Sequence, residues 1–265
     1  MTQGRGRIRE LLESHGLKPD QRLGQNFLAD PQLIDRIVRV AAVGVGDQVV
    51  EVGAGTGALT EALLATGARV VAYEIDERLR PILEDVAPGA EFRFEDATES
   101  LVDDLAGGSW VLVANLPYNV GTGIVLDVLQ RAPSVARLVV MVQKEVADRL
   151  TASPGSRVYG LPSVIVSLYG SSHRAFTVPR DVFIPKPDVA SAVVVIERTE
   201  PHPDAPDAVG LARVAFGQRR KMLRRSLAGV LDNPVEVLES AGCRSTQRAE
   251  ELSPDDFLRI AAVAS

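Results

Sequence analysis

Asparagine, proline and tyrosine stand together where an apolar run ends, in W-V-L-V-A-N-L-P-Y-N-V at residues 110–120. Proline lacks the N–H that a β-ladder needs, so the strand must end by Leu116 and present Asn115 and Tyr118 at its carboxyl edge. Oxygens of Asn115, Leu116 and Pro117 can accept hydrogen bonds from an amino group, and Tyr118 offers a face on which a base can stack. A strand ended by a proline turn, with Tyr118 packed in the core, is the alternative.

A glycine-rich turn, E-V-G-A-G-T-G-A-L-T at residues 51–60, follows the first expected strand. Glycines here let the backbone turn tightly and approach a ligand, and the next helix directs its N-terminus at that ligand. Gly53, Gly55 and Ala58 also satisfy the relaxed dinucleotide-binding pattern, which is a weak signal by itself. The turn therefore predicts a nucleotide-like cofactor, against the alternative of a tight turn without a ligand.

Two acids end the next two expected strands. Glu74 stands about twenty residues after Gly53, where a carboxylate accepts hydrogen bonds from ribose hydroxyls. Asp96 follows the third strand, where it can receive an adenine amino group, although it could also cap the next helix. A nicotinamide dinucleotide and S-adenosylmethionine both fit these acids. Asn-Leu-Pro-Tyr suits the holding of an adenine N6 and has no evident purpose in a dehydrogenase, so we expect S-adenosylmethionine and in-line methyl transfer.

A largely buried sheet must position these residues. Between about residues 48 and 197, short β-branched runs alternate with helix-patterned segments such as Ala58–Thr66 and Glu77–Val86, which is the rhythm of a doubly wound parallel sheet. Seven runs are strand candidates: Q-V-V-E-V, R-V-V-A-Y-E-I, E-F-R-F, W-V-L-V-A, R-L-V-V-M-V, S-V-I-V-S-L-Y and A-V-V-V-I. Before the sheet, Asp30 and Pro31 indicate the start of a helix.

The strand pattern ends at T-E-P-H-P-D-A-P, residues 199–206, which is stiff and strand-breaking. We therefore expect a catalytic domain over residues 1–199, with a mobile basic arm containing Arg5, Arg7 and Arg9, and a small α-helical domain over residues 200–265. The expected fold is α/β, a doubly wound seven-stranded Rossmann-like methyltransferase sheet with this helical domain appended.

The composition limits the other possibilities. The 265 residues carry a formal net charge of −6 and 46% hydrophobic residues, which is typical of a soluble globular protein. One cysteine and three scattered histidines disfavour a disulfide, a thiolate-rich zinc site and metal catalysis in general. No apolar run is long enough to span a membrane, and the N-terminus M-T-Q-G-R-G-R-I-R-E lacks a secretory signal. We expect a cytoplasmic monomer without a metal.

With G-A-G-T-G, Glu74, Asp96 and N-L-P-Y in order, the sequence resembles the small-subunit (16S) ribosomal RNA adenine dimethyltransferases of the KsgA type. The likeness covers nearly the whole chain and includes L-G-Q-N-F-L (23–28), M-V-Q-K-E-V (141–146), P-G-S-R-V-Y-G (154–160), F-I-P-K-P-D-V-A-S (183–191) and F-G-Q-R-R-K-M-L-R-R-S-L (216–227). Two departures bear on loop rigidity. Residues 120–123 are V-G-T-G instead of a serine- and proline-containing stretch, and G-A-G-T-G stands where G-P-G-L-G is commoner.

The resemblance implies a set of site residues. Cofactor contacts are implied for Asn26, Leu28, Gly53, Gly55, Glu74, Ile75, Asp96, Ala97 and Asn115, and contacts to the target nitrogen for Asn115, Leu116, Pro117 and Tyr118. Phe183 would be a second aromatic face for the base. The Pro185-x-Pro187 pair could hold it at a pocket mouth, although a rigid connector with a core phenylalanine fits this stretch equally well.

Five cations gather within residues 218–225 of an otherwise acidic protein, namely Arg219, Arg220, Lys221, Arg224 and Arg225. A solvated helix face with apolar residues turned inward is the ordinary alternative. Beside a base-modifying domain, we expect these cations to contact RNA phosphates, which position a protein without reading sequence.

The resemblance implies dimethylation of two adjacent adenosines near the 3′ end of 16S rRNA, with the small ribosomal subunit as partner during its assembly. The nearest alternative is an erythromycin-resistance-type methyltransferase of large-subunit rRNA. R-R-K-M-L-R-R-S-L and R-A-E-E-L-S (248–253) favour the small subunit. A nicotinamide oxidoreductase is a remote alternative, and an assembly factor that needs only to bind rRNA stays open.

Overall fold

The computed structural model describes residues 3–264. Contacts between Cα atoms divide the chain into two compact units. Unit 1 comprises Met1–Ala147 and His173–Glu197, and unit 2 comprises Asp148–Ser172 and Arg198–Ser265. The boundary expected after residue 199 lies close to the one at Glu197. The assignment of all earlier residues to one domain is wrong, because Asp148–Ser172 packs with the C-terminal helices.

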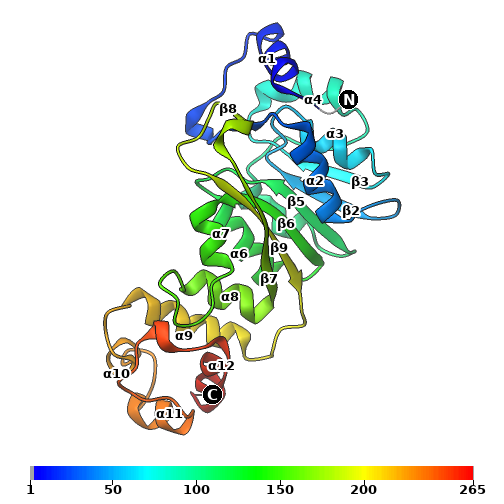
Figure 1. Ribbon diagram of the computed structural model, residues 1–265. Coiled ribbons are helices and arrows are strands. Elements are labelled where there is room, and N and C mark those ends of the chain that lie inside the picture. Colours follow the sequence, from blue (N-terminus) through cyan, green and yellow to red (C-terminus); the bar gives the residue numbers. More distant parts are fainter. Residues whose placement is uncertain (1–2, 265) are drawn as a thin grey trace. The chain divides into compact units, whose positions relative to one another are not determined.

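A mixed seven-stranded sheet forms the centre of unit 1, in the order β4-β3-β2-β5-β6-β9-β7 (Figure 1). Its strands are β2 (Gln48–Val52), β3 (Arg69–Tyr73), β4 (Glu91–Arg93), β5 (Trp110–Asn115), β6 (Val135–Gln143), β7 (Gly170–Val178) and β9 (Ser191–Arg198). Strands β2 to β6 pair in parallel, whereas β9 runs antiparallel to β6. The predicted Rossmann-like sheet of seven strands is therefore confirmed, but the sheet is not wholly parallel.

The strand order places the glycine turn beside the Asn-Leu-Pro-Tyr segment. The chain winds outward from β2 to β3 and β4, and then returns to add β5 on the other side of β2. The carboxyl ends of β2 and β5 thus flank the point where the order reverses, which is where open α/β sheets bind ligands. Gly53 follows one of these strands and Asn115 ends the other.

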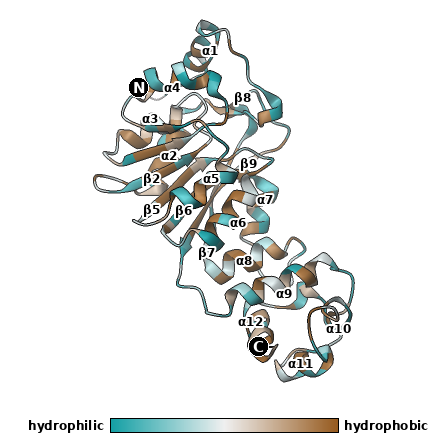
Figure 2. Cartoon of the chain, turned by 180° about the vertical axis from the view of Figure 1, so that it is seen from behind, coloured by the Kyte–Doolittle hydropathy of each residue, from teal (hydrophilic) through white to brown (hydrophobic). Residues whose placement is uncertain are grey.

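Helices cover both faces of the sheet. One face packs against α2 (Pro31–Ala41), α3 (Ala58–Leu64) and α4 (Arg80–Val86) through alternate strand residues such as Val49, Val113 and Val139. The other face meets α6 (Gly121–Arg131), which contacts α5 (Ala97–Asp104). Hydrophobic residues run along β5 and β6 in Figure 2. As predicted, Asp30 caps α2 by accepting the N–H groups of Gln32 and Leu33.

One strand prediction is wrong. The run S-V-I-V-S-L-Y lies in helix α8 (Leu161–Tyr169), and the remaining strand is β7, G-S-S-H-R-A-F-T-V. A short apolar run cannot be assigned to helix or strand by periodicity alone. Pro162 in the first turn and the Ser163 hydroxyl, which accepts the Gly160 N–H, favour a helix start. Strand β7 ends the sheet and carries exposed polar residues, which hides its strand signal.

Unit 1 also contains a small two-stranded ribbon and an N-terminal helix outside the main sheet. A two-stranded antiparallel ribbon joins β1 (Phe27–Leu28) to β8 (Phe183–Ile184). The basic N-terminal segment forms helix α1 (Arg5–Ser14), which buries Ile8, Leu11 and Leu12. Ahead of it, the Gln3 amide donates to the carbonyl of Thr56 in the glycine turn at 2.8 Å. The expectation of a mobile arm is therefore wrong for the described residues.

Unit 2 is helical, as predicted for the C-terminal part of the chain. It contains α8, α9 (Ala205–Gly217), α10 (Leu223–Ser226), α11 (Pro234–Ser240) and α12 (Pro254–Ala264). Helices α8, α9 and α12 pack on one another, and the aromatic rings of Tyr159, Phe216 and Phe257 form part of this core. Among residues 3–264, no helix is long and apolar enough to cross a bilayer.

Candidate active site

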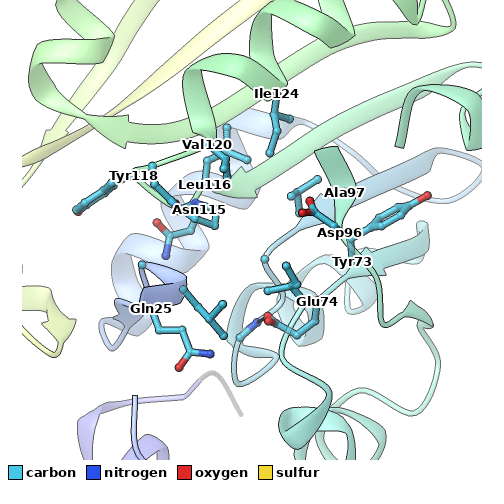
Figure 3. A pocket seen from close by; sticks show the side chains of 18 of the residues that line it. Gln25, Tyr73, Glu74, Asp96, Ala97, Asn115, Leu116, Tyr118, Val120 and Ile124 are labelled. Carbon is cyan, nitrogen blue, oxygen red and sulfur yellow. Dashed lines mark hydrogen bonds between the residues drawn. The ribbon is translucent and has the colours of Figure 1, made fainter. Parts of the chain in front are cut away.

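A pocket opens at the carboxyl ends of β2, β3 and β5. It encloses about 920 Å³, counted with its open mouth. Its walls are residues 23–27, the glycine turn, the segments after β3 and β4, and residues 115–120. Figure 3 shows Glu74 and Asp96 on one side of this pocket and Asn115 and Tyr118 on the other. The structure therefore brings together most residues that the sequence predicted for the site.

Glu74 is held rigidly at the end of β3. Its two carboxylate oxygens accept the backbone N–H groups of Gly55, at 2.8 Å, and Asp76, at 2.9 Å. Burial raises the pKa of Glu74, while these hydrogen bonds act against that change. Since each oxygen has a second lone pair, the carboxylate can still receive a pair of hydroxyl groups.

The glycine turn lets a ligand approach its backbone because Gly53, Gly55 and Gly57 carry no side chains. Gly53, Gly55 and Gly57 all have positive φ, the left-handed region that glycine adopts without strain. A Cβ on Gly55 would stand 3.0 Å from a ring carbon of Phe27, and one on Gly53 would stand 3.5 Å from the Pro117 ring. The turn is therefore a close-fitting floor between two pocket walls.

Asp96 lines the pocket and also caps a helix. Its Oδ1 accepts the backbone N–H of Thr98 at 2.9 Å and the hydroxyl of the same residue at 2.7 Å, at the start of α5. Capping and ligand binding were alternatives for Asp96 in the sequence. Both are compatible in the structure, because Oδ2 is not used by the cap. Ala97 and the exposed Ile75 complete this side of the pocket.

Asn115 has a fixed orientation. Its Nδ2 donates to the backbone carbonyl of Asn26 at 3.1 Å, and a carbonyl can only accept. The amide therefore keeps its Oδ1 as an acceptor for another group. Pro117 is less available than predicted, because its carbonyl already accepts the N–H of Gly121 at 2.9 Å at the start of α6. The Asn115 side chain and the Leu116 carbonyl remain as the acceptors for an amino group.

Tyr118 lies at the pocket wall, half-buried, with its hydroxyl 2.7 Å from the Ser191 hydroxyl. Burial raises the pKa of the Tyr118 phenol, so the group stays protonated near neutral pH. The adjoining departure from the family pattern has a structural reason. A Cβ on Gly121 would stand 3.0 Å from the Leu116 Cβ, so glycine lets the first turn of α6 approach that residue closely.

Two predicted site residues are placed elsewhere. Leu28 and Phe183 pair with each other across the β1–β8 ribbon, and both belong to the hydrophobic core. Phe183 is 0% exposed and does not line the pocket. The expectation that Phe183 forms a second aromatic face is therefore wrong for this structure, and the core alternative holds. Phe27 lines the pocket in place of Leu28, because alternate residues of a strand point to opposite sides.

Several pocket residues were not predicted. Tyr73, Gln25, Val120 and Ile124 contribute to the lining. Gln25 also crosses between walls, since its Nε2 donates to Asp76 at 2.8 Å. Asp76 is further bound by the Arg78 guanidinium, which lowers the pKa of that carboxyl. The polar L-G-Q-N-F-L turn beside a cofactor-like loop was the signal for Gln25.

A second buried acid lies behind the pocket. Glu51 precedes the glycine turn, is 1% exposed and accepts a 2.6 Å hydrogen bond from the Thr60 hydroxyl. Loss of hydration raises the pKa of Glu51 to about 8; the Thr60 hydrogen bond opposes this change and the nearby Glu74 charge adds to it. Protonated Glu51 avoids placing two negative charges under one cofactor site.

The basic segment of unit 2 has two kinds of cation. Arg219 binds the Glu250 carboxylate at 2.8 Å and the Arg157 carbonyl at 3.1 Å, and Lys221 donates to Gln218 at 2.7 Å. Arg220, Arg224 and Arg225 are exposed. Leu223 and Leu227 are fully buried, as the solvated-helix alternative required, whereas Met222 is 39% exposed. The exposed arginines can serve as phosphate ligands, and Arg219 first serves to hold the loop that contains Arg157.

Among residues 3–264, no group of three or more histidine, cysteine, aspartate or glutamate side chains could hold an ion. The absence of a catalytic metal stays a prediction.

Known proteins resemble the chain over most of its length. Residues 16–265 match the family model described as ribosomal RNA adenine dimethylase. The chain is 47% identical to ribosomal RNA small subunit methyltransferase A of Leifsonia xyli subsp. xyli, over 98% of this chain and 97% of that protein. The protein of the same name from Kineococcus radiotolerans is 44% identical, over 96% of this chain and 89% of its own length.

Solved structures support the same relationship. A dimethyladenosine transferase from Plasmodium falciparum has a TM-score of 0.74 and 25% identity, covering 88% of this chain and 95% of its own. The 23S rRNA methyltransferase ErmE has a TM-score of 0.67 and 26% identity, covering 90% of this chain and 99% of its own. Both share the mixed sheet, and the sequence identity to the small-subunit proteins is clearly higher.

Proposed function

The chain belongs to the ribosomal RNA adenine dimethylase family, and on this premise we propose that it dimethylates N6 of two adjacent adenosines near the 3′ end of 16S rRNA, with S-adenosylmethionine as methyl donor. The observation that carries the proposal is the meeting of two sets of groups in one pocket. Acids suited to a nucleoside lie on one side, and an oriented amide acceptor with an aromatic ring lies on the other.

The polar groups that line the pocket suit S-adenosylmethionine. Glu74 would accept the ribose hydroxyls with its remaining lone pairs, and Asp96 would receive the adenine amino group through Oδ2. The three glycines of the turn would let the amino acid part of the cofactor lie against the backbone. When bound, the cofactor supplies a methyl group on a positively charged sulfur, which is already a good leaving group. The remaining contacts proposed for Asn26, Gly53, Gly55, Ile75 and Ala97 all come from pocket-lining residues.

The target adenine would be held by Asn115, Leu116 and Tyr118. An amino nitrogen conjugated with the ring is a poor nucleophile, so acceptors for both of its hydrogens favour a pyramidal nitrogen with an available lone pair. Asn115 Oδ1 is suited to this task because its Nδ2 is fixed on Asn26. Tyr118 offers one ring face to a base taken out of its helix. Alignment and charge stabilisation thus replace a strong base.

The exposed arginines of unit 2 would hold RNA phosphates. Arg220, Arg224 and Arg225 lie in one short basic segment of an acidic protein. Phosphate contacts fix the position of the RNA, and its shape and the pocket must select the adenosine. We also propose that the protein acts as a cytoplasmic monomer on the small ribosomal subunit during assembly, as the sequence led us to expect.

The deciding experiment uses radiolabelled S-adenosylmethionine with undermethylated small and large ribosomal subunits, followed by nucleoside analysis. Dimethyladenosine in small-subunit rRNA alone is the expected result. Labelling of large-subunit rRNA alone would favour the erythromycin-resistance type, for which the 26% identity to ErmE is the supporting observation. Absence of label together with tight binding of NADH would favour the remote alternative, a nicotinamide-dependent oxidoreductase. Binding without labelling would favour an assembly factor.

A further inference from the structure

Ser191 occupies an unusually fixed position behind the pocket wall. It is the first residue of β9, is 0% exposed and pairs with Gln143 of β6. The carbonyl of Ala190, just before it, accepts the N–H of Lys144 at 2.8 Å. The backbone around Ser191 is therefore held by the centre of the sheet, and its short side chain has little freedom to move.

The Ser191 hydroxyl reaches a residue far away in the sequence. Its Oγ lies 2.7 Å from the hydroxyl of Tyr118, and either oxygen could donate. Because Ser191 is fully buried, water cannot readily replace this partner, and an unpaired hydroxyl there would cost free energy. The hydrogen bond therefore joins the Tyr118 side chain, at the pocket wall, to Ser191, whose backbone is held in the sheet.

We propose that Ser191 is a positioning residue that fixes the ring of Tyr118 in the orientation needed to stack on the target base. The inference rests on the proposed function of Tyr118 as a stacking face. An aromatic side chain that is already ordered loses less conformational entropy when a base binds. Ser191 itself does not line the pocket and acts only through Tyr118.

The connection of Ser191 to β8 gives the same segment a second role. Residues 183–191 begin in the β1–β8 ribbon, where Ile184 pairs with Phe27 of the pocket wall. They end at Ser191, which contacts Tyr118 on the other wall. Residues 183–191 thus contact two sides of the pocket, through Phe27 beside the glycine turn and through the Tyr118 ring at the proposed site of the target base. Phe183 is buried at the start of this segment and anchors it to the core.

A double-mutant cycle tests the proposal. Ser191→Ala and Tyr118→Phe each remove one hydroxyl of the pair, and each should lower kcat/KM for the ribosomal subunit by roughly two- to tenfold, the range for one neutral hydrogen bond. S-adenosylmethionine affinity should stay unchanged. The double variant should lose no more than either single variant, because all three lack the same interaction. Ser163→Ala is the control for loss of a buried hydroxyl that is not in contact with Tyr118; that hydroxyl donates to the Arg149 carbonyl and accepts the Gly160 N–H.

A spectroscopic measurement tests the ring without using activity. The chain has four tyrosines, so ring-labelled ¹³C-tyrosine gives few signals, and the Tyr118→Phe variant identifies those of Tyr118. Ser191→Ala should shift these signals and lower the order of the ring, while Ser163→Ala leaves them unchanged. If wild-type protein forms no dimethyladenosine, the proposed function fails, and this measurement still decides whether Ser191 orders the ring.

Three results would overturn the inference. Losses that multiply in the double variant would show that the hydroxyl groups act separately. Unchanged Tyr118 signals in Ser191→Ala would show that the ring keeps its position without the hydrogen bond. A fall in thermal stability and cofactor affinity, with normal ring order, would assign Ser191 a structural role only.

Discussion

The Nδ2 of Asn115 donates to the backbone carbonyl of Asn26 across 3.1 Å, joining the end of β5 to the turn before β1. Asn115→Asp tests whether this bond sets the orientation of the side chain. Aspartate has the same size but no N–H, so an oxygen would face the Asn26 carbonyl. We expect Asn115→Asp and Asn115→Ala to lower the rate of methyl transfer by at least about tenfold, the effect of a buried polar group left unpaired. Single-turnover transfer and cofactor titration measure both effects, and an active aspartate variant would contradict the assignment.

Glu74 is expected to carry much of the cofactor affinity. Glu74→Ala should weaken S-adenosylmethionine binding by about 1–3 kcal/mol, the range for hydrogen bonds to a charged group, which titration calorimetry can measure. Glu77→Ala is the control, because Glu77 is an exposed acid of the same turn that pairs with Arg80 outside the pocket. Equal affinities of the two variants would remove Glu74 from the ribose site.

Stacking and hydroxyl chemistry can be separated at Tyr118. Tyr118→Ala removes the ring and should abolish most activity, since stacking of a base on an aromatic ring contributes about 1–3 kcal/mol. Tyr118→Phe keeps the ring and loses only the bond to Ser191, so its effect should be much smaller. Rates of adenine methylation at saturating cofactor distinguish the two. Equal losses in both variants would assign the hydroxyl a direct role in transfer.

Glu51 should make the stability of the protein fall with rising pH. Its pKa is raised to about 8 in the fold from 4.5, so between these pH values the folded protein binds a proton that the unfolded chain releases. The contribution of this proton to the free energy of unfolding is therefore greatest below pH 4.5 and is lost as the pH rises to about 8. Above that pH the contribution changes little. A pKa that differs by one between the folded and unfolded chain corresponds to about 1.4 kcal/mol in the free energy of unfolding.

The variant Glu51→Gln resembles the protonated acid at every pH. Its melting temperature should match that of the wild type below pH 4.5 and exceed it increasingly as the pH rises towards 8. Glu84→Gln, at an exposed site, should follow the wild type throughout. Parallel melting curves for wild type and Glu51→Gln would mean that Glu51 is ionised in the folded protein.

The basic segment of unit 2 makes a prediction about salt. Replacing Arg220, Arg224 and Arg225 by alanine should weaken binding to the small subunit and flatten its dependence on salt, by roughly 0.7–0.9 in the log–log slope for each lost phosphate contact. Cofactor affinity should not change. A variant lacking the exposed Arg213, Arg244 and Arg248 carries the same change in charge and is the control. Equal slopes for the two triple variants would refute a specific phosphate surface.

The sequence was most informative where backbone chemistry restricts the choices. Pro117 had to end β5, and Asp30 with Pro31 had to begin α2, so both were predicted correctly. The ends of β2, β3 and β5 could be brought together because parallel strands share one carboxyl edge. These rules do not depend on distant partners.

What the sequence could not supply were contacts between distant segments. An aromatic residue just before the Pro185-x-Pro187 pair fits a pocket face or the core equally well, and the pairing of Phe183 with Leu28 decides. The helix at 161–169 belongs to unit 2, where it packs against α9 and α12 and is buried at most of its positions. Its largely apolar sequence therefore lacks the periodicity that would distinguish it from a strand. Ser191 ends the motif F-I-P-K-P-D-V-A-S, but the sequence could not show that its hydroxyl contacts Tyr118, which lies 73 residues away.

Of the seven strands of the sheet, β9 is the last to be synthesised, but it lies inside the sheet, between β6 and β7. While the chain is emerging from a ribosome, β6 therefore ends the sheet as a largely apolar, unpaired edge, which is a site where nascent chains aggregate. Until residues 184 and 191 have been synthesised, Phe27 lacks its strand partner Ile184, and Tyr118 lacks its hydrogen-bond partner Ser191. Residues 183–198 thus cover the exposed edge of β6 and supply the partners of two pocket residues in the same stretch of synthesis.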